Sequence, residues 1–164
     1  MKYTKYAAER LVRLPAEPIW KVLSDLSHIA RNDPYHHDFK FVEGSLQEGK
    51  GATFITTHSY WPIFPFPRDE VVCKVIDWQP LARVTVVEKS QKKYRSHIQD
   101  FTLEPCGQYV TVVHFEVNLF SIPWWLWPLR AWVTFKALRR MRQKLKEVEE
   151  AAWSRYLAER SRAV

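Results

Sequence analysis

Residues 128–160, PLRAWVTFKALRRMRQKLKEVEEAAWSRYLAER, decide the fold, because this stretch contains no glycine and no proline after its first residue. An uninterrupted run of this length predicts one long helix. Between Leu138 and Ala152, apolar or small residues recur in steps of three and four, which is the spacing of one buried helical face. The members of this expected stripe are Ala131, Leu138, Met141, Leu145, Val148 and Ala152.

The chain before this helix consists of short segments in which apolar and polar residues alternate, with turn residues between them. Such alternation predicts strands. A short amphipathic helix is expected over residues 18–26, with another turn over 28–31. We therefore predict an α+β fold: a seven-stranded antiparallel sheet curled around the long C-terminal helix, with two short helices after the first strand. The expected strands are residues 3–14, 39–46, 52–60, 68–77, 83–90, 94–104 and 109–120.

Length and composition predict a single folded domain spanning residues 1–164, with 46% hydrophobic and 26% charged residues. The two cysteines, Cys73 and Cys106, lack the CxxC spacing of a zinc or redox site. Thiols in a reducing cytoplasm are therefore expected, with a single disulfide as the alternative. We expect no signal peptide, because charged residues precede any apolar run. Residues 119–135 are too short and too interrupted to span a bilayer.

The net charge of +7 is unevenly distributed. One basic run extends from Lys136 to Lys146 without an acidic residue, and a second cluster extends from Lys89 to Arg95 around an expected hairpin. Both are interpreted either as solvated surfaces or as sites of attraction for anionic lipid, nucleic acid or an acidic ligand.

Three segments resemble one known superfamily. They are RLPAEPIWKVLSD (13–25), NDPYHHDFKFVEG (32–44) and FTLEPCGQYVTVVHFEV (101–117). They are similar to the N-terminal, second-strand and last-hairpin segments of the polyketide cyclase/dehydrase and lipid-transport superfamily, which includes START-like and birch-pollen-allergen-like proteins. The resemblance implies the helix-grip fold, with a mostly apolar cavity between sheet and helix. Members bind lipids, sterols, isoprenoid quinones, polyketides or plant hormones, and a minority catalyse cyclisation or dehydration.

Two expected strands carry polar residues on one face. Because side chains alternate with period two, Arg95, His97 and Gln99 share a face with Phe101, and Phe54, Thr56, His58 and Tyr60 share another. If these faces line the cavity, their polar ends could orient a ligand or serve as acid and base. The alternative is that these strand ends are solvated. The remaining candidate ligand-binding residues are Val113, Phe115, Trp127 and Leu138.

No metal site and no cofactor are expected. His36 and His37 are adjacent, no pair of histidines has helical spacing around a Glu, and only 4 glycines are present, without a phosphate-binding loop.

Aromatic residues concentrate in two expected loops, WPIFPFP (61–67) and SIPWWLWPL (121–129). In an antiparallel meander, both loops and the basic hairpin at residues 91–93 leave the same edge of the sheet. They are interpreted either as a plug at that end of the core or as a hydrophobic rim that meets an anionic membrane.

The sequence therefore predicts a protein that binds or transports a hydrophobic or amphipathic small molecule, with peripheral contact to an anionic membrane as a further expectation. A polyketide cyclase or dehydratase that uses His97, His58 or Tyr60 is the first alternative. Nucleic-acid binding through the basic C-terminal helix is the second, and it is disfavoured because strand-borne stacking aromatics are missing.

Overall fold

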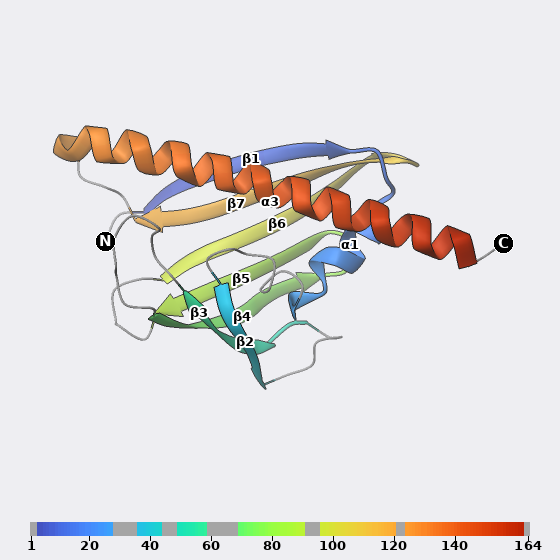
Figure 1. Ribbon diagram of the computed structural model, residues 1–164, viewed down its shortest axis with the longest axis horizontal. Helices are drawn as coiled ribbons and strands as arrows, with labels where there is room; N and C mark the ends of the chain where they lie inside the picture. The colour runs from blue at the N-terminus through green and yellow to red at the C-terminus, as the bar shows by residue number, and fades with distance from the viewer. Residues whose placement is uncertain are drawn as a thin grey trace.

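The structure is a computed structural model that describes residues 3–27, 36–43, 49–58, 69–90, 96–120 and 124–162. Its strands form one seven-stranded sheet in the order β1-β7-β6-β5-β4-β3-β2, with all neighbours antiparallel. Figure 1 shows one long helix lying along one face of this sheet. The elements are β1 (Tyr3–Val12), α1 (Ala16–Leu23), β2 (His36–Glu43), β3 (Thr53–His58), β4 (Asp69–Gln79), β5 (Arg83–Ser90), β6 (Ser96–Gly107), β7 (Val110–Phe120), the 3-10 helix η1 (Trp124–Leu126) and α3 (Trp127–Arg162).

The predicted α+β architecture is confirmed: seven antiparallel strands precede a C-terminal helix of 36 residues. The first of the two expected short helices is α1. The turn expected over residues 28–31 lies outside the described residues. The 3-10 helix η1 falls in a segment that was expected to be a loop. Pro128 occupies the first turn of α3, where its missing N–H costs no hydrogen bond.

One stripe of α3 is buried against the sheet. We call the face of the sheet that α3 lies on the inner face. Met141, Leu145, Val148 and Ala152 are all buried, as the spacing predicted, and α3 packs on β1 and on α1. Ala131, however, is exposed. The stripe begins later than predicted because the first turns of α3 extend past the ends of β1 and β7 (Figure 1), where no strand lies beneath them.

The inner face is apolar because side chains alternate along each strand. In β7, Val113, Phe115 and Val117 are buried, while the residues between them are partly exposed, as the alternation predicted. Phe101 lies opposite Phe115 in the register of β6 and β7. Their rings stack with centroids 4.1 Å apart. This pair fixes the middle of the sheet beneath α3.

The far end of the core is closed by Trp20 of α1 and Trp78 of β4, whose rings meet edge to face with centroids 5.1 Å apart. Gly49 comes so close that a Cβ atom there would stand 2.0 Å from Cδ2 of Trp78. Its φ of 65° is also one that residues with side chains rarely adopt. A glycine is therefore required at position 49 for the chain to pass over the indole.

Replacing Trp20 by Ala should destabilise the fold strongly, because the side chain is buried and the truncation leaves a large cavity. We expect the free energy of unfolding in urea to fall by about 3–5 kcal/mol. Leu11→Ala is the control, because Leu11 is exposed and should change stability little. Equal unfolding curves for wild type and Trp20→Ala would contradict the assignment of Trp20 to the core.

Candidate functional site

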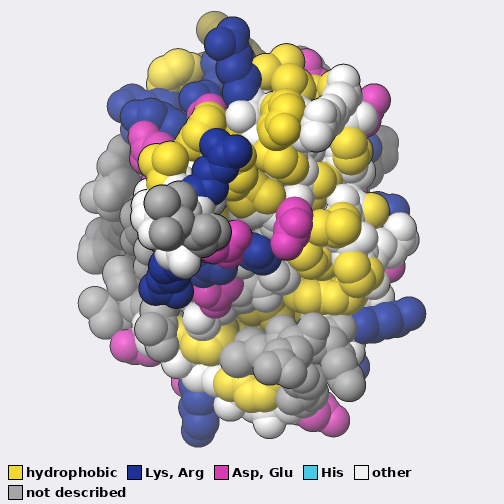
Figure 2. Space-filling view, turned by 90° about the vertical axis from the view of Figure 1, so that its right-hand side faces the viewer, with side chains coloured by type: hydrophobic (Ala, Val, Ile, Leu, Met, Phe, Trp, Pro, Cys, Tyr) yellow, Lys and Arg dark blue, Asp and Glu magenta, His cyan; other side chains and the backbone are white. Residues whose placement is uncertain are grey.

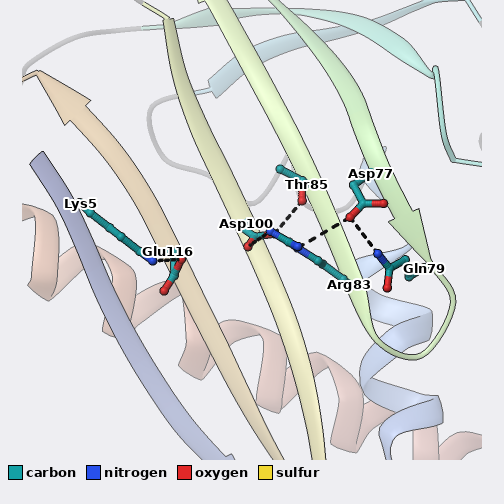
Figure 3. A network of polar contacts seen from close by, with 7 residues as sticks. All are labelled: Lys5, Asp77, Gln79, Arg83, Thr85, Asp100 and Glu116. Carbon is teal, nitrogen blue, oxygen red and sulfur yellow. Dashed lines mark hydrogen bonds and ion pairs between the residues drawn. The ribbon is translucent and has the colours of Figure 1, made fainter. Parts of the chain in front are cut away.

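Charged and polar residues form one group on the outer face of the sheet, the face turned away from α3 (Figure 3). The Arg83 guanidinium binds Asp100 through two hydrogen bonds of 2.9 Å, one from Nε and one from Nη2. Thr85 Oγ1 donates to Asp100 Oδ1 at 2.7 Å. The hydrogen bond with Asp100 raises the pKa of Arg83 above its ordinary value, so this cation stays charged.

The rest of this outer group is held in the same way. Asp77 accepts a hydrogen bond of 3.0 Å from Gln79 and lies 3.8 Å from Arg83, while Lys5 pairs with Glu116 at 2.6 Å. Each carboxylate in Figure 3 thus meets a cation or donor from its own or a neighbouring strand. These contacts join β5 to β4 and to β6, and β1 to β7, and they serve the fold.

Asp100→Ala tests that structural role. Asp100 is buried beneath Arg83, so its removal leaves Thr85 and the guanidinium without their acceptor. We expect the free energy of unfolding to fall by about 1–3 kcal/mol. Asp77→Ala is the matched control. The Asp77 carboxylate lies farther from the Arg83 guanidinium than Asp100 does, so this substitution should lower the free energy of unfolding less. A smaller effect for Asp100 than for Asp77 would contradict the network as described.

A second polar group lies on the inner face, among apolar side chains. Glu88 of β5 is only 2% exposed, and the side-chain amide of Gln99 on β6 donates to its Oε1 at 2.5 Å. Val84, Val86 and Glu88 alternate onto the same face of β5, and both valines are buried. The Glu88 carboxylate therefore lies next to the apolar side chains that β5 places on this face.

The register extends this group across the sheet. Glu88 lies opposite Cys73 on β4 and opposite position 97 on β6. Cys73 in turn lies opposite Phe54, and both side chains are buried. Thr56, two residues along β3, is also fully buried. Opposite residues of an antiparallel pair share a face, so Phe54, Cys73 and Glu88 form one row across the inner face of the sheet.

A carboxylate in such surroundings is informative because removing it from water is costly without hydrogen bonds or a charge partner. Interior carboxylates close to an apolar pocket are candidates for ligand recognition or proton transfer. The Glu88–Gln99 pair, with the apolar row around it, is therefore the candidate functional site.

The structure places most of the sequence-predicted site residues on this inner face. Buried there are Phe54, Thr56, Phe101, Val113 and Phe115. Gln99 is partly buried, and Leu138 of α3 is partly buried beside the core. Whether a ligand contacts them stays a prediction.

The other candidates are not brought to this place by the described structure. Trp127 is 70% exposed, because it begins the part of α3 that extends past the sheet. His58 and His97 belong to β3 and β6, but their side chains lie outside the described residues, as do Tyr60 and Arg95 entirely. The loops at 61–67 and 91–93 are likewise outside the description.

Sequence reasoning missed Glu88, although a signal was present. We placed the neighbouring Lys89 in a basic hairpin and did not consider the acid before it. The alternation of Val84, Val86 and Glu88 puts this acid on the apolar side of its strand. An acidic residue in phase with buried valines is the pattern that would have identified it.

The surface of the described structure contains grooves, two of which are defined by their lining residues. One of about 400 Å³ lies between β1 and α3 and is lined by Arg10, Phe135, Leu138, Arg139, Arg142, Gln143 and Lys146. The other, of about 510 Å³, is lined by Trp20, Lys21, Ser24, Asp25, Leu26, Trp78 and Pro80. Neither is the enclosed space beneath α3 that the sequence led us to expect, so the internal cavity stays a prediction.

Within the described ranges, no three His, Cys, Asp or Glu side chains are grouped so that they could hold a metal ion. The same part of the chain contains no helix that is both long and apolar enough to cross a membrane.

Comparison with known proteins extends the fold assignment. No family model and no curated protein matches the sequence. Solved structures do match: the protein TTHA0849 of Thermus thermophilus is 16% identical, with 92% of this chain and 98% of that chain covered and a TM-score of 0.68. The ZhuI aromatase/cyclase of Streptomyces sp. R1128 is 13% identical, with 94% and 96% covered and a TM-score of 0.69.

Norcoclaurine synthase of Thalictrum flavum, solved with dopamine and hydroxybenzaldehyde, is 16% identical, with 93% of this chain and 88% of that chain covered and a TM-score of 0.64. At these identities the similarity demonstrates the fold, and the activities named belong to those proteins. The chain has the helix-grip fold of these solved structures, the fold that the resemblance of its sequence implied.

Proposed function

We propose that this protein binds an apolar or amphipathic small molecule between the inner face of the sheet and α3. The observation that carries the proposal is the Glu88–Gln99 pair, a hydrogen-bonded carboxylate and amide set in an apolar face. Apolar sites with a few well-placed polar groups are typical of small-molecule binding, because the apolar walls supply affinity and the polar groups fix orientation.

The chemistry of the pair defines the ligand. A carboxylate offers about four lone-pair positions, so Glu88 can accept a hydrogen bond from a ligand hydroxyl or amine in addition to the one from Gln99. The stacked Phe101 and Phe115 rings supply a flat apolar surface on the same face. A lipid, isoprenoid or polyketide-like molecule with one donor group fits this combination.

Known helix-grip structures support the proposal, since one of them holds dopamine and hydroxybenzaldehyde. Cys73 and Cys106 are not joined in a disulfide. Thiols that form no disulfide suit a reducing compartment, so we place this function in the cytoplasm.

A second function, catalysis of the polyketide cyclase or dehydratase type, is favoured by one observation. Glu88 lies opposite position 97 of β6, which is a histidine. A carboxylate and an imidazole at neighbouring positions are the residue types that exchange protons with a bound substrate. In that case Glu88 removes or delivers a proton while Gln99 holds its carboxylate in place.

The first experiment identifies the ligand. Protein purified without detergent is analysed by native mass spectrometry, and any bound molecule is extracted and identified. Displacement is followed with N-phenyl-1-naphthylamine, a neutral apolar fluorophore. We expect a saturable fluorescence increase that the extracted ligand reverses. A protein that neither carries an apolar molecule nor binds this fluorophore would contradict the proposal.

The second experiment tests the orienting role of Glu88. Glu88→Gln keeps the shape of the side chain and removes its charge, so affinity for a donor-bearing ligand should fall about tenfold, the value of one charge-assisted hydrogen bond. Binding of the neutral fluorophore, which relies on the apolar walls, should change little.

Glu104→Gln is the matched control, because Glu104 is an exposed acid of β6 and its loss removes the same charge. If both variants bind the ligand equally well, Glu88 does not orient it. Under the catalytic alternative, Glu88→Gln binds the extracted molecule normally and leaves it unconverted, whereas wild type releases a product of altered mass.

A further inference from the structure

The charges of α3 are separated along its length. Its first twenty residues, 127–146, contain seven cations and no Asp or Glu: Arg130, Lys136, Arg139, Arg140, Arg142, Lys144 and Lys146. The following sixteen residues contain four glutamates. Figure 2, which faces the end of the molecule that carries α1 and the C-terminus of α3, shows acidic side chains beside basic ones.

This distribution works against the stability of the helix. Cations three or four residues apart on a helix repel one another, and this spacing separates Lys136 from Arg140, Arg139 from Arg142, and Arg142 from Lys146. In the part of the chain that the structure describes, Arg139 and Arg142 form no ion pair, whereas Lys146 pairs with Glu150 at 3.3 Å. The described fold therefore gives no ion-pair partner to Arg139 and Arg142, which leaves these two cations available to an external partner.

Apolar side chains are exposed on the same segment. Trp125 is 63% exposed, Trp127 70%, Leu129 41% and Phe135 60%. Trp125 belongs to η1, and the other three belong to residues 127–135 of α3. Within α3, which the structure describes along its whole length, no buried residue precedes Met141, so the packing of the core does not require these aromatics.

Phe135 and three of the cations share one side of the helix. Phe135, Arg139, Arg142 and Lys146 follow one another in steps of four, three and four, the spacing of a single helical face. All four line the groove of about 400 Å³ beside β1. The groove is thus lined by both apolar side chains and ammonium or guanidinium groups, a combination suited to an anionic headgroup.

We propose that this surface, formed by η1 and residues 127–146 of α3, docks on a lipid bilayer that contains anionic lipids. Trp is favoured where water meets lipid, and cations beside it are attracted to anionic headgroups. A nucleic acid would neutralise the same cations but would leave Leu129, Phe135 and the two tryptophans largely in water. A bilayer satisfies both kinds of side chain at once.

Flotation with vesicles tests the docking surface. Wild type should bind vesicles of phosphatidylcholine and phosphatidylserine, should not bind phosphatidylcholine alone, and should bind less as salt rises. Arg139→Gln/Arg142→Gln should weaken binding about 30-fold, which corresponds to ~1 kcal/mol for each cation. Trp125→Ala/Trp127→Ala keeps the net charge and should weaken binding by more than about tenfold, because apolar insertion is lost.

Two matched controls use the other end of α3. Arg160→Gln/Arg162→Gln removes two charges from the same helix, and Leu157→Ala removes an exposed apolar side chain there. Both should bind vesicles like wild type, and circular dichroism confirms that each variant is folded. Glu88→Gln should also bind normally, since the inner face is not part of this surface, so failure of either proposal leaves the other standing.

Three results would overturn the proposal. The first is that wild type does not bind the anionic vesicles. The second is that the Arg160/Arg162 variant loses as much binding as the Arg139/Arg142 variant, which would assign binding to net charge alone. The third is that wild type binds a single-stranded RNA more tightly than the vesicles at equal ionic strength, with loss in the Arg139/Arg142 variant and none in the tryptophan variant.

Discussion

The structure depends on the burial of one stripe of α3 against the inner face of the sheet. Met141, Leu145 and Val148 each leave water completely or nearly so, which stabilises the fold by roughly 1.5–3 kcal/mol per side chain. A seven-stranded sheet that is apolar on one face cannot leave that face in water, and α3 with α1 is what covers it. The position of every inner-face residue relative to the helix follows from this packing.

The two faces of the sheet use acidic residues differently. On the outer face Asp100 is covered by Arg83, which arrives from the adjacent strand and neutralises it. On the inner face it is an uncharged amide, that of Gln99, that donates to Glu88. The Asp100–Arg83 pair joins neighbouring strands on the outer face, whereas the Glu88–Gln99 pair lies among the apolar side chains of the inner face. This difference separates the structural network from the candidate site.

Much of the fold could be predicted from local pattern, because period-two alternation and an uninterrupted helix are visible in the sequence. β5 begins and ends where expected, at Arg83 and Ser90. The burial of Asp100 could not be predicted, since it depends on the register that brings Arg83 across from β5. The exposure of Trp127 depends on where the strands end beneath α3, a property of the assembled sheet. The alternation does place Glu88 inward, but only strand pairing reveals its partner Gln99.

The buried residues of α3 lie from its middle toward its C-terminal part, between Met141 and Ala152. Lys21 and Asp25 of the α1 region hold Glu159 and Arg155 through contacts of 3.0 and 2.8 Å, while the first turns of α3, all of them described, have no buried residue. The helix is thus held firmly from Met141 onward, and its first turns are held less firmly. Its backbone amides should exchange hydrogen with solvent along a gradient, slowly from Met141 onward and quickly near Trp127, because local opening is easiest where few apolar contacts must break.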